Sequence, residues 1–155
     1  MKIYIDGREI EVPQGTLLIK AALNNNINIP HFCWHSELAI SGSCRMCLVE
    51  VGTPRRNPDG SVAVDSNKEP IINYMPKLQI ACNTVISDGM RINTKTEKVH
   101  KARAAVMEFL LINHPLDCPI CDEAGACKLQ DYSTAYSCGG SRFNEKKNEN
   151  PKRVK

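Results

Sequence analysis

The chain has 155 residues, enough for one domain or two small ones, with a formal net charge of +3 and only 5% aromatic residues. Small domains with such a modest apolar core often need metal sites or disulfides for stability, and the eight cysteines can supply them. The mild charge, without a basic patch interleaved with aromatic residues, argues against nucleic-acid binding. The start has no signal-peptide pattern and no run of about 18 apolar residues occurs, so we expect a cytosolic protein whose reduced cysteines ligate metal.

The first residues predict a hairpin followed by a helix. Residues 2–6 and 8–12 alternate apolar and polar side chains on either side of Asp6-Gly7, which is typical of two antiparallel strands joined by a tight turn. Thr16 then stands where an N-cap is expected, ahead of a helix over residues 17–26.

The middle of the chain predicts further strands with an exposed excursion between them. Strands are expected at residues 48–51 and 90–93. Asn57-Pro58-Asp59-Gly60 indicates a turn, and residues 62–74 a long exposed hairpin, after which the chain returns through residues 77–81. The excursion lengthens the spacing between two cysteines, at little cost in entropy if its ends are pinned.

Four cysteines of this half form the pattern Cys-x10-Cys-x2-Cys-x34-Cys: Cys33, Cys44, Cys47 and Cys82. Glycine and serine before Cys44 let the backbone wrap closely around an inorganic core and point N–H groups at its sulfurs. Three ligands in one loop region and a fourth from a distant strand end resemble the 2Fe–2S site of plant-type ferredoxins, where only four residues separate the first two ligands. A zinc site is the alternative.

A second potential metal site follows a long helix. Apolar residues recur at helical spacing from residue 96, which predicts a helix of about 18 residues that ends at His114-Pro115. The pattern His-x3-Cys-x2-Cys-x5-Cys comes next: His114, Cys118, Cys121 and Cys127. One neutral imidazole among three thiolates makes a centre less negative than four thiolates, which shifts its potential upward. Structural zinc can use the same ligands.

The rest of the chain is expected to add no ligand. Cys127 should begin a short helix over residues 128–136. Cys138 has no partner in either pattern and is expected to be a thiol without a ligand role. Residues 142–155 are basic and almost devoid of apolar side chains, which predicts a mobile tail or the edge of a longer chain.

Taken together, the two cysteine sets resemble the N-terminal part of the iron–sulfur-rich large subunit of bacterial respiratory complex I, the NuoG family. The resemblance covers almost the whole chain and rests on three runs: Gly42-Ser43-Cys44-Arg45-Met46-Cys47-Leu48-Val49, His114-Pro115-Leu116-Asp117-Cys118-Pro119-Ile120-Cys121 and Gly125-Ala126-Cys127-Lys128-Leu129-Gln130-Asp131. It implies an α+β fold with a β-grasp 2Fe–2S ferredoxin domain at residues 1–95. A small, mainly helical 4Fe–4S domain at 96–140 and a polar tail at 141–155 would follow.

The resemblance also implies cofactors and partners. A 2Fe–2S cluster is expected on the four upstream cysteines, and a 4Fe–4S cluster on His114, Cys118, Cys121 and Cys127. Members of this family pass electrons, taken from NADH at a flavin subunit, towards quinone. The implied partners are that flavin subunit and other peripheral-arm subunits, and the implied location is the cytoplasmic face of the inner membrane, reached only through the complex. No Gly-x-Gly-x-x-Gly run occurs, so we expect an electron-transfer protein that binds neither NADH nor flavin itself.

Other assignments remain open at the level of sequence. The same N-terminal module occurs in the diaphorase partner of NAD-linked hydrogenases, in iron-only hydrogenases and in some formate dehydrogenases, where it is also a wire. A zinc-stabilised interaction module is the alternative of another class. Members of the NuoG family continue into further cysteine clusters and a large molybdopterin-oxidoreductase-like domain, which these 155 residues do not contain.

Overall fold

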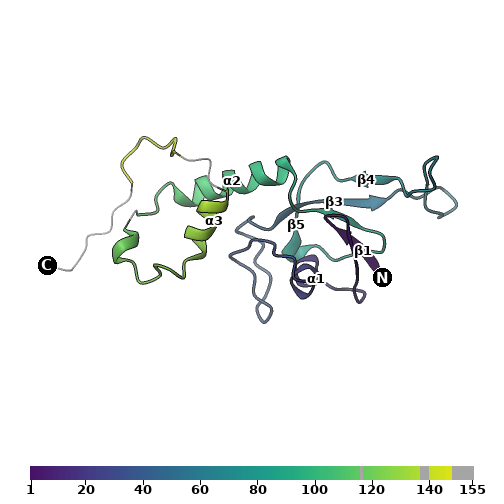
Figure 1. Cartoon of the computed structure of the whole chain (residues 1–155), viewed down its shortest axis with the longest axis horizontal. Coiled ribbons are helices and arrows are strands. Elements are labelled where there is room, and N and C mark those ends of the chain that lie inside the picture. The colour runs from purple at the N-terminus through teal and green to yellow at the C-terminus, as the bar shows by residue number, and fades with distance from the viewer. Residues whose placement is uncertain (116, 137–139, 148–155) are drawn as a thin grey trace. The chain divides into compact units, whose positions relative to one another are not determined.

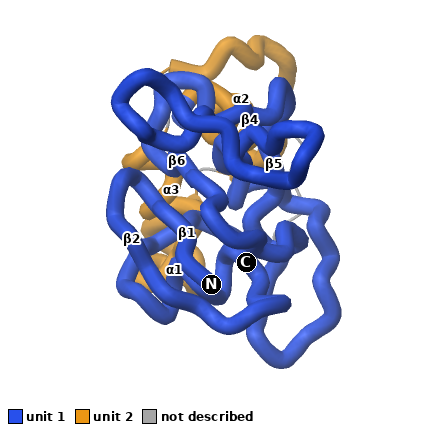
Figure 2. Tube along the Cα trace, turned by 90° about the vertical axis from the view of Figure 1, so that its right-hand side faces the viewer, with its two compact units in different colours: residues 1–100 blue, residues 101–155 orange. Residues whose placement is uncertain are grey.

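The computed structural model describes residues 1–115, 117–136 and 140–147. The chain divides into two compact units, Met1–His100 and Lys101–Lys155, which Figure 2 distinguishes by colour. Leu116 of the expected ligand loop and the thiol of Cys138 lie outside the described residues. Each unit contains the residues of one of the two expected metal sites.

The first unit is built on a mixed sheet (Figure 1). Its strand order is β2-β1-β6-β3-β4, and β5 also pairs with β3. The strands are β1 (Lys2–Ile5), β2 (Arg8–Glu11), β3 (Leu48–Pro54), β4 (Ile72–Tyr74), β5 (Gln79–Ile80) and β6 (Arg91–Asn93). β1 and β6 run parallel, whereas the other pairings are antiparallel. The last strand of the unit therefore lies between the first and third strands.

The β1–β2 hairpin confirms the sequence prediction. Asp6 and Gly7 have φ angles of 50° and 82°, which a tight hairpin turn with the right-handed twist requires. The Asp6 carboxylate also accepts hydrogen bonds from the backbone N–H of Thr94 at 2.7 Å and from its Oγ1 at 2.6 Å. The buried Thr94 follows β6, so this contact fastens the hairpin to the strand that pairs with it.

Helix α1 (Leu18–Asn24) is shorter than expected, and the predicted cap is wrong. The Thr16 hydroxyl donates to the carbonyl of Pro13 at 2.9 Å instead of accepting from the helix. The N–H of Leu18 instead donates to the carbonyl of Thr84 at 2.8 Å, beside a β-bridge between Leu17 and Val85. Pairing with a distant segment therefore sets the start of the helix, in place of the local side-chain cap.

The sheet and α1 enclose one apolar core. Its fully buried members include Ile3, Ile5, Leu18, Ile19, Ile29, Val49, Val51 and Ile92. Two of the expected ligands, Cys47 and Cys82, belong to the same core and are each only 1% exposed. Half of the expected 2Fe–2S site is therefore part of the hydrophobic core.

The excursion between β3 and β4 is a hairpin extension, as predicted, although its return strand β4 joins the main sheet. Bridges between Arg56 and Val62 and between Val64 and Pro70 continue the pairing beyond the sheet. The turn is closed by the N–H of Gly60, which donates to the carbonyl of Asn57 at 2.9 Å. The insertion therefore extends the sheet edge away from the cysteines.

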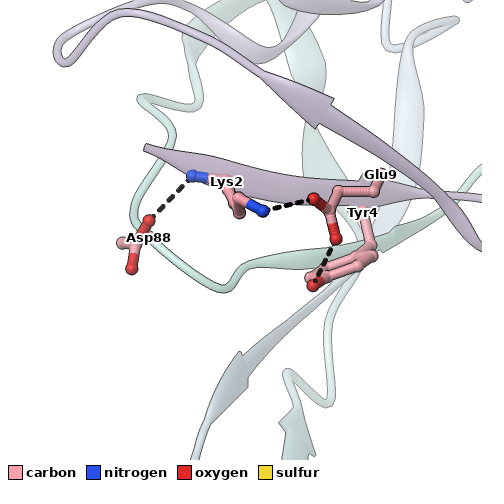
Figure 3. Close-up of polar contacts among 4 residues, drawn as sticks. All are labelled: Lys2, Tyr4, Glu9 and Asp88. Atoms are coloured by element: carbon pink, nitrogen blue, oxygen red, sulfur yellow. Dashed lines mark hydrogen bonds and ion pairs between the residues drawn. The ribbon is translucent and has the colours of Figure 1, made fainter.

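A polar network covers the outer side of the hairpin (Figure 3). The Lys2 ammonium donates to Glu9 at 2.7 Å, and the Tyr4 hydroxyl donates to the other carboxylate oxygen at 2.9 Å. These two hydrogen bonds, that of Lys2 first, hold the pKa of Glu9 below its usual value. The backbone N–H of Lys2 also donates to Asp88 at 2.8 Å. All these contacts are exposed, so they help to specify register and add little stability.

Gly52 of β3 lies directly against side chains of β4. A Cβ at this position would lie 2.5 Å from Cγ2 of Ile72 and 3.0 Å from the Tyr74 ring. We expect Gly52→Ala to lower the free energy of unfolding by about 1–3 kcal/mol, measured by chemical denaturation, because the packed side chains of Ile72 and Tyr74 must move. Gly140→Ala is the control, since its Cβ would meet nothing within 4 Å, and should change stability by less than about 0.5 kcal/mol. Equal stability of the two variants would contradict the close packing.

The second unit contains most of α2 (Glu97–Leu111), the 3-10 turn η2 (Cys118–Ile120) and α3 (Lys128–Tyr136). α3 has the predicted bounds, whereas α2 ends three residues before His114. α2 and α3 lie side by side (Figure 1), and the buried Arg103 donates to the Tyr136 hydroxyl at 3.3 Å. Within the described ranges, no helix combines the length and the apolar character needed to cross a bilayer.

Candidate metal centres

The loop that carries Cys33 and Cys44 turns backbone N–H groups toward sulfur. The N–H of Cys44 donates to Sγ of Cys33 at 3.4 Å. Gly42 and Arg45 adopt left-handed conformations, with φ angles of 63° and 58°. A Cβ at Gly42 would lie 3.2 Å from the Ile80 side chain, so glycine suits this position sterically as well as conformationally. A left-handed residue on each side of Cys44 forms the kind of concave backbone that binds an anionic core.

Cys47 and Cys82 meet because two strands pair behind the loop. Cys47 directly precedes β3, and Cys82 lies in the short 3-10 helix η1 (Ala81–Asn83) that follows β5. Leu48 of β3 is the register partner of Ile80 of β5. The N–H of Ala81 donates to the carbonyl of Cys47 at 3.0 Å, so the distant fourth cysteine arrives beside the third.

The pKa values of these thiols show that they influence one another. Burial raises the pKa of Cys33, but hydrogen bonds from Cys44 and Ser43 outweigh burial and bring it to about 7. Burial raises the pKa of Cys82 to about 12, and Cys47, followed by Cys33 and Cys44, acts in the same direction. Four thiolates placed together repel one another, and a bound cationic iron centre would remove that repulsion. The donor set therefore fits an iron–sulfur cluster.

A cavity of about 180 Å³ in the second unit is lined by all four expected ligands of the other site: His114, Cys118, Cys121 and Cys127. His114 lies in the turn after α2, Cys118 is the first residue of η2 and Cys121 follows η2, and Cys127 directly precedes α3. The N–H of Cys121 donates to the carbonyl of Cys118 at 3.3 Å, so a 3-10 turn sets the spacing of this pair. One imidazole and three thiols around one hollow fit a bound cluster.

The described cysteines are all free thiols. Across residues 1–115, 117–136 and 140–147, no three His, Cys, Asp or Glu side chains converge closely enough to hold a single metal ion. In a 2Fe–2S cluster the four ligands are divided between two irons, so the cluster does not require such convergence.

Ser43 hydrogen-bonds Cys33, as expected for the serine directly before Cys44. One contributor to these sites escaped the sequence analysis. Lys147 donates to the backbone carbonyl of His114 at 3.2 Å, although 33 positions separate the two residues. No local pattern links a lysine in a polar C-terminal segment to that turn.

The fold and these two sites define an iron–sulfur protein of the α+β class. Residues 1–97 match the family model described as a 2Fe-2S iron-sulfur cluster binding domain, and the chain belongs to this family. Residues 103–142 match a second model, the NADH-ubiquinone oxidoreductase-G iron-sulfur binding region. The predicted cofactors, one 2Fe–2S and one 4Fe–4S cluster, are thereby confirmed.

Curated relatives agree with the resemblance inferred from the sequence. NADH-quinone oxidoreductase subunit 3 of Thermus thermophilus is 42% identical over 88% of this chain and 17% of its own length. The G subunit of the NADH-quinone oxidoreductase of Rickettsia typhi is 44% identical over 95% of this chain and 19% of its own. The mitochondrial NADH dehydrogenase (ubiquinone) iron-sulfur protein 1 of Solanum tuberosum is 41% identical over 95% of this chain and 17% of its own length. The chain thus spans less than a fifth of the length of these relatives.

A solved structure is similar in fold over most of this chain. A crystal structure of an NAD+-reducing NiFe-hydrogenase in the H2-reduced state superposes with a TM-score of 0.70 and 28% sequence identity. The match covers 96% of this chain and 54% of that one. Similar chains therefore occur both in NADH-quinone oxidoreductases and in a hydrogenase that reduces NAD+.

Proposed function

We propose that this chain relays electrons from an NADH-oxidising flavin subunit toward quinone, as an iron–sulfur part of a complex I-type NADH dehydrogenase. The observation that carries the proposal is the match of both units to iron–sulfur regions, together with the Rickettsia typhi relative that aligns over 95% of the chain. The chain covers less than a fifth of that relative, so NADH oxidation and quinone reduction are assigned to other parts of the complex. The chain's own role is to transfer electrons between the two.

In this proposal, the first cluster is a 2Fe–2S cluster held in a β-grasp ferredoxin domain at residues 1–95. Its ligands are Cys33, Cys44, Cys47 and Cys82. The parallel pairing of the terminal strands β1 and β6, with α1 between hairpin and loop, supports this assignment. The N–H of Cys44 at Sγ of Cys33 supports the ligand set, because such hydrogen bonds raise the reduction potential of a cluster.

The second cluster is a 4Fe–4S cluster in a helical domain at residues 96–140, followed by the polar segment at 141–155. Its ligands are His114, Cys118, Cys121 and Cys127, and the cavity that these four residues share supports the assignment. The bound clusters supply the one-electron chemistry. The chain holds them at fixed positions, and its imidazole ligand keeps the second centre less negative than four thiolates would.

The proposed partners are the flavin-bearing, NADH-oxidising subunit and further peripheral-arm subunits of a hetero-oligomeric complex. The relatives support this proposal, because their names make them subunits of NADH-quinone oxidoreductase. Association with the cytoplasmic face of the inner membrane would then occur only through the complex. The chain is an enzyme component in this sense and carries no catalytic residue of its own.

A second candidate is the electron-transfer subunit of an NAD-linked hydrogenase, with a formate dehydrogenase as a related possibility. The structural match to the NAD+-reducing hydrogenase over 96% of this chain favours it. Affinity purification of the tagged chain from its native cells, followed by mass spectrometry, separates the candidates. We expect a flavin subunit together with quinone-reducing subunits. Recovery of a hydrogenase subunit in their place would favour the second candidate.

The cofactor content gives the direct test. We expect the full chain, purified without oxygen, to be brown and to show EPR signals from two distinct centres after dithionite reduction. Metal analysis should give about six irons per chain, the sum of a 2Fe–2S and a 4Fe–4S cluster. A colourless protein with stoichiometric zinc would instead establish the zinc-stabilised interaction module.

A further inference from the structure

The C-terminal segment of the described residues, 140–147, is attached to α2 by charged side chains. Arg142 makes a bidentate ion pair with Glu108, in which its Nε and Nη2 each donate to a different carboxylate oxygen at 2.6 Å. Arg142 lowers the pKa of Glu108, chiefly through this hydrogen bonding, so the pair remains ionised at neutral pH. Five residues later, the Lys147 ammonium reaches the end of the same helix.

Lys147 closes the turn that presents His114. Its Nζ donates to the carbonyl of Leu111 at 2.9 Å and to the carbonyl of His114 at 3.2 Å. The N–H of His114 also donates to the carbonyl of Leu111 at 3.3 Å. The turn is therefore held twice, by its own backbone and by one ammonium that bridges its two ends.

The position suits a cation. α2 ends at Leu111 and has no basic residue in its own last turn. The last carbonyls of a helix lack partners within it and carry partial negative charge, so an ammonium stabilises them. Lys147 supplies this missing charge from 36 residues further along the chain. The Arg142–Glu108 pair tethers the segment nearby, which reduces the entropy that Lys147 loses when it is fixed.

The two residues that Lys147 holds both line the cavity of the second centre, since Leu111 and His114 each contribute to its wall. We propose that Lys147 is a positioning residue for the 4Fe–4S cluster: it fixes the turn that carries the His114 ligand and sets a positive charge beside it. This inference rests on the proposed function, which makes His114 a ligand. An ordinary helix-capping lysine would affect only the stability of the unit.

A positioning role for Lys147 has consequences for the cluster that a helix-capping role does not have. Reduction adds one negative charge, so a nearby cation stabilises the reduced form and raises the midpoint potential. Lys147 is partly buried, and partly buried charges are screened by salt less than exposed ones. A fixed turn also holds the backbone of His114 in one position, so we expect it to narrow the EPR line shape. Both properties can be measured without any enzymatic assay.

The experiment uses the full chain with both clusters assembled anaerobically and follows each EPR signal through a redox titration. Lys147→Met should move the midpoint potential of the 4Fe–4S signal to more negative values, so that several-fold less of it is reduced at a fixed ambient potential. The 2Fe–2S signal of the same molecules should not move. Lys147→Arg, which keeps the charge and the donors, should restore the wild-type potential. Lys146→Met, which removes the same charge one residue away, is the matched control and should leave the potential unchanged.

Lys147→Gln keeps a donor without the charge and serves if the methionine variant does not assemble its cluster. We expect it to lower the potential while retaining the line shape. A potential and line shape that are identical in the wild type, the methionine variant and the glutamine variant would overturn the inference.

The proposed function is checked separately with His114→Ala. If His114→Ala leaves the 4Fe–4S signal intact, the proposed ligand set is wrong, and the role of Lys147 is wrong with it. If His114→Ala abolishes the signal but the Lys147 variants keep the wild-type potential and line shape, only the role of Lys147 is wrong.

Discussion

His114→Ala should remove or strongly weaken the 4Fe–4S signal of the reduced protein and leave the 2Fe–2S signal intact. His114 lines the same cavity as Cys118, Cys121 and Cys127, all in the second unit, whereas the other four expected ligands lie in the first. Alanine leaves one iron of the proposed cluster without a protein ligand. Its effect should therefore stay within one unit. The measurement is low-temperature EPR after dithionite reduction, together with the iron content.

Two further variants make this test specific. His114→Cys supplies a fourth thiolate and should retain the cluster, but at a more negative potential, because the centre gains one negative charge. His100→Ala removes an exposed histidine of the same helix α2 and should leave both signals as in the wild type. Survival of both signals at full intensity in His114→Ala would show that His114 is not a ligand.

Cys82→Ser should produce the opposite pattern, with loss of the 2Fe–2S signal and retention of the 4Fe–4S signal. Cys82 is 1% exposed and reaches the site only because β5 pairs with β3. Serine is a poor ligand for iron compared with thiolate. It also buries a hydroxyl in an apolar core, at a cost of about 1–3 kcal/mol if that hydroxyl stays unsatisfied. We expect a lower denaturation midpoint in addition to the spectroscopic change.

The reciprocal control is Cys127→Ser in the second unit, which should spare the 2Fe–2S signal. Cys82→Ala separates ligand loss from the buried hydroxyl, because it removes the sulfur without adding a polar group. The assignment of Cys82 would be wrong if the alanine variant kept a 2Fe–2S signal of wild-type shape and intensity.

The elements that sequence predicted well are those specified by neighbouring residues. The Asp6-Gly7 turn fixed the first hairpin, and α3 has the predicted bounds because its periodicity begins directly after Cys127. The pairing of β1 with β6 joins Tyr4 to Arg91, and no local pattern encodes such a distant partner. The Thr16 cap was wrong for the same reason, since a distant strand-like segment satisfies the start of α1.

The candidate sites follow the same rule. Cys118 and Cys121 could be paired from their spacing, because a single 3-10 turn brings them together. Cys82 could be included only by analogy with ferredoxins, since its arrival depends on the β3–β5 register. Lys147 could not be predicted at all, because it acts through backbone carbonyls, which every residue carries.

The unequal burial of the four upstream cysteines has a consequence for the protein when it lacks its cluster. Oxidants attack thiols according to their thiolate content and their accessibility. Cys33, whose pKa is about 7, is partly exposed, whereas Cys82, whose pKa is about 12, is closed off in the core. We therefore expect peroxide to attack the metal-free protein first at the loop and to spare the two core thiols. Cys47 and Cys82, two of the four expected ligands, would then stay reduced and available to hold a cluster again.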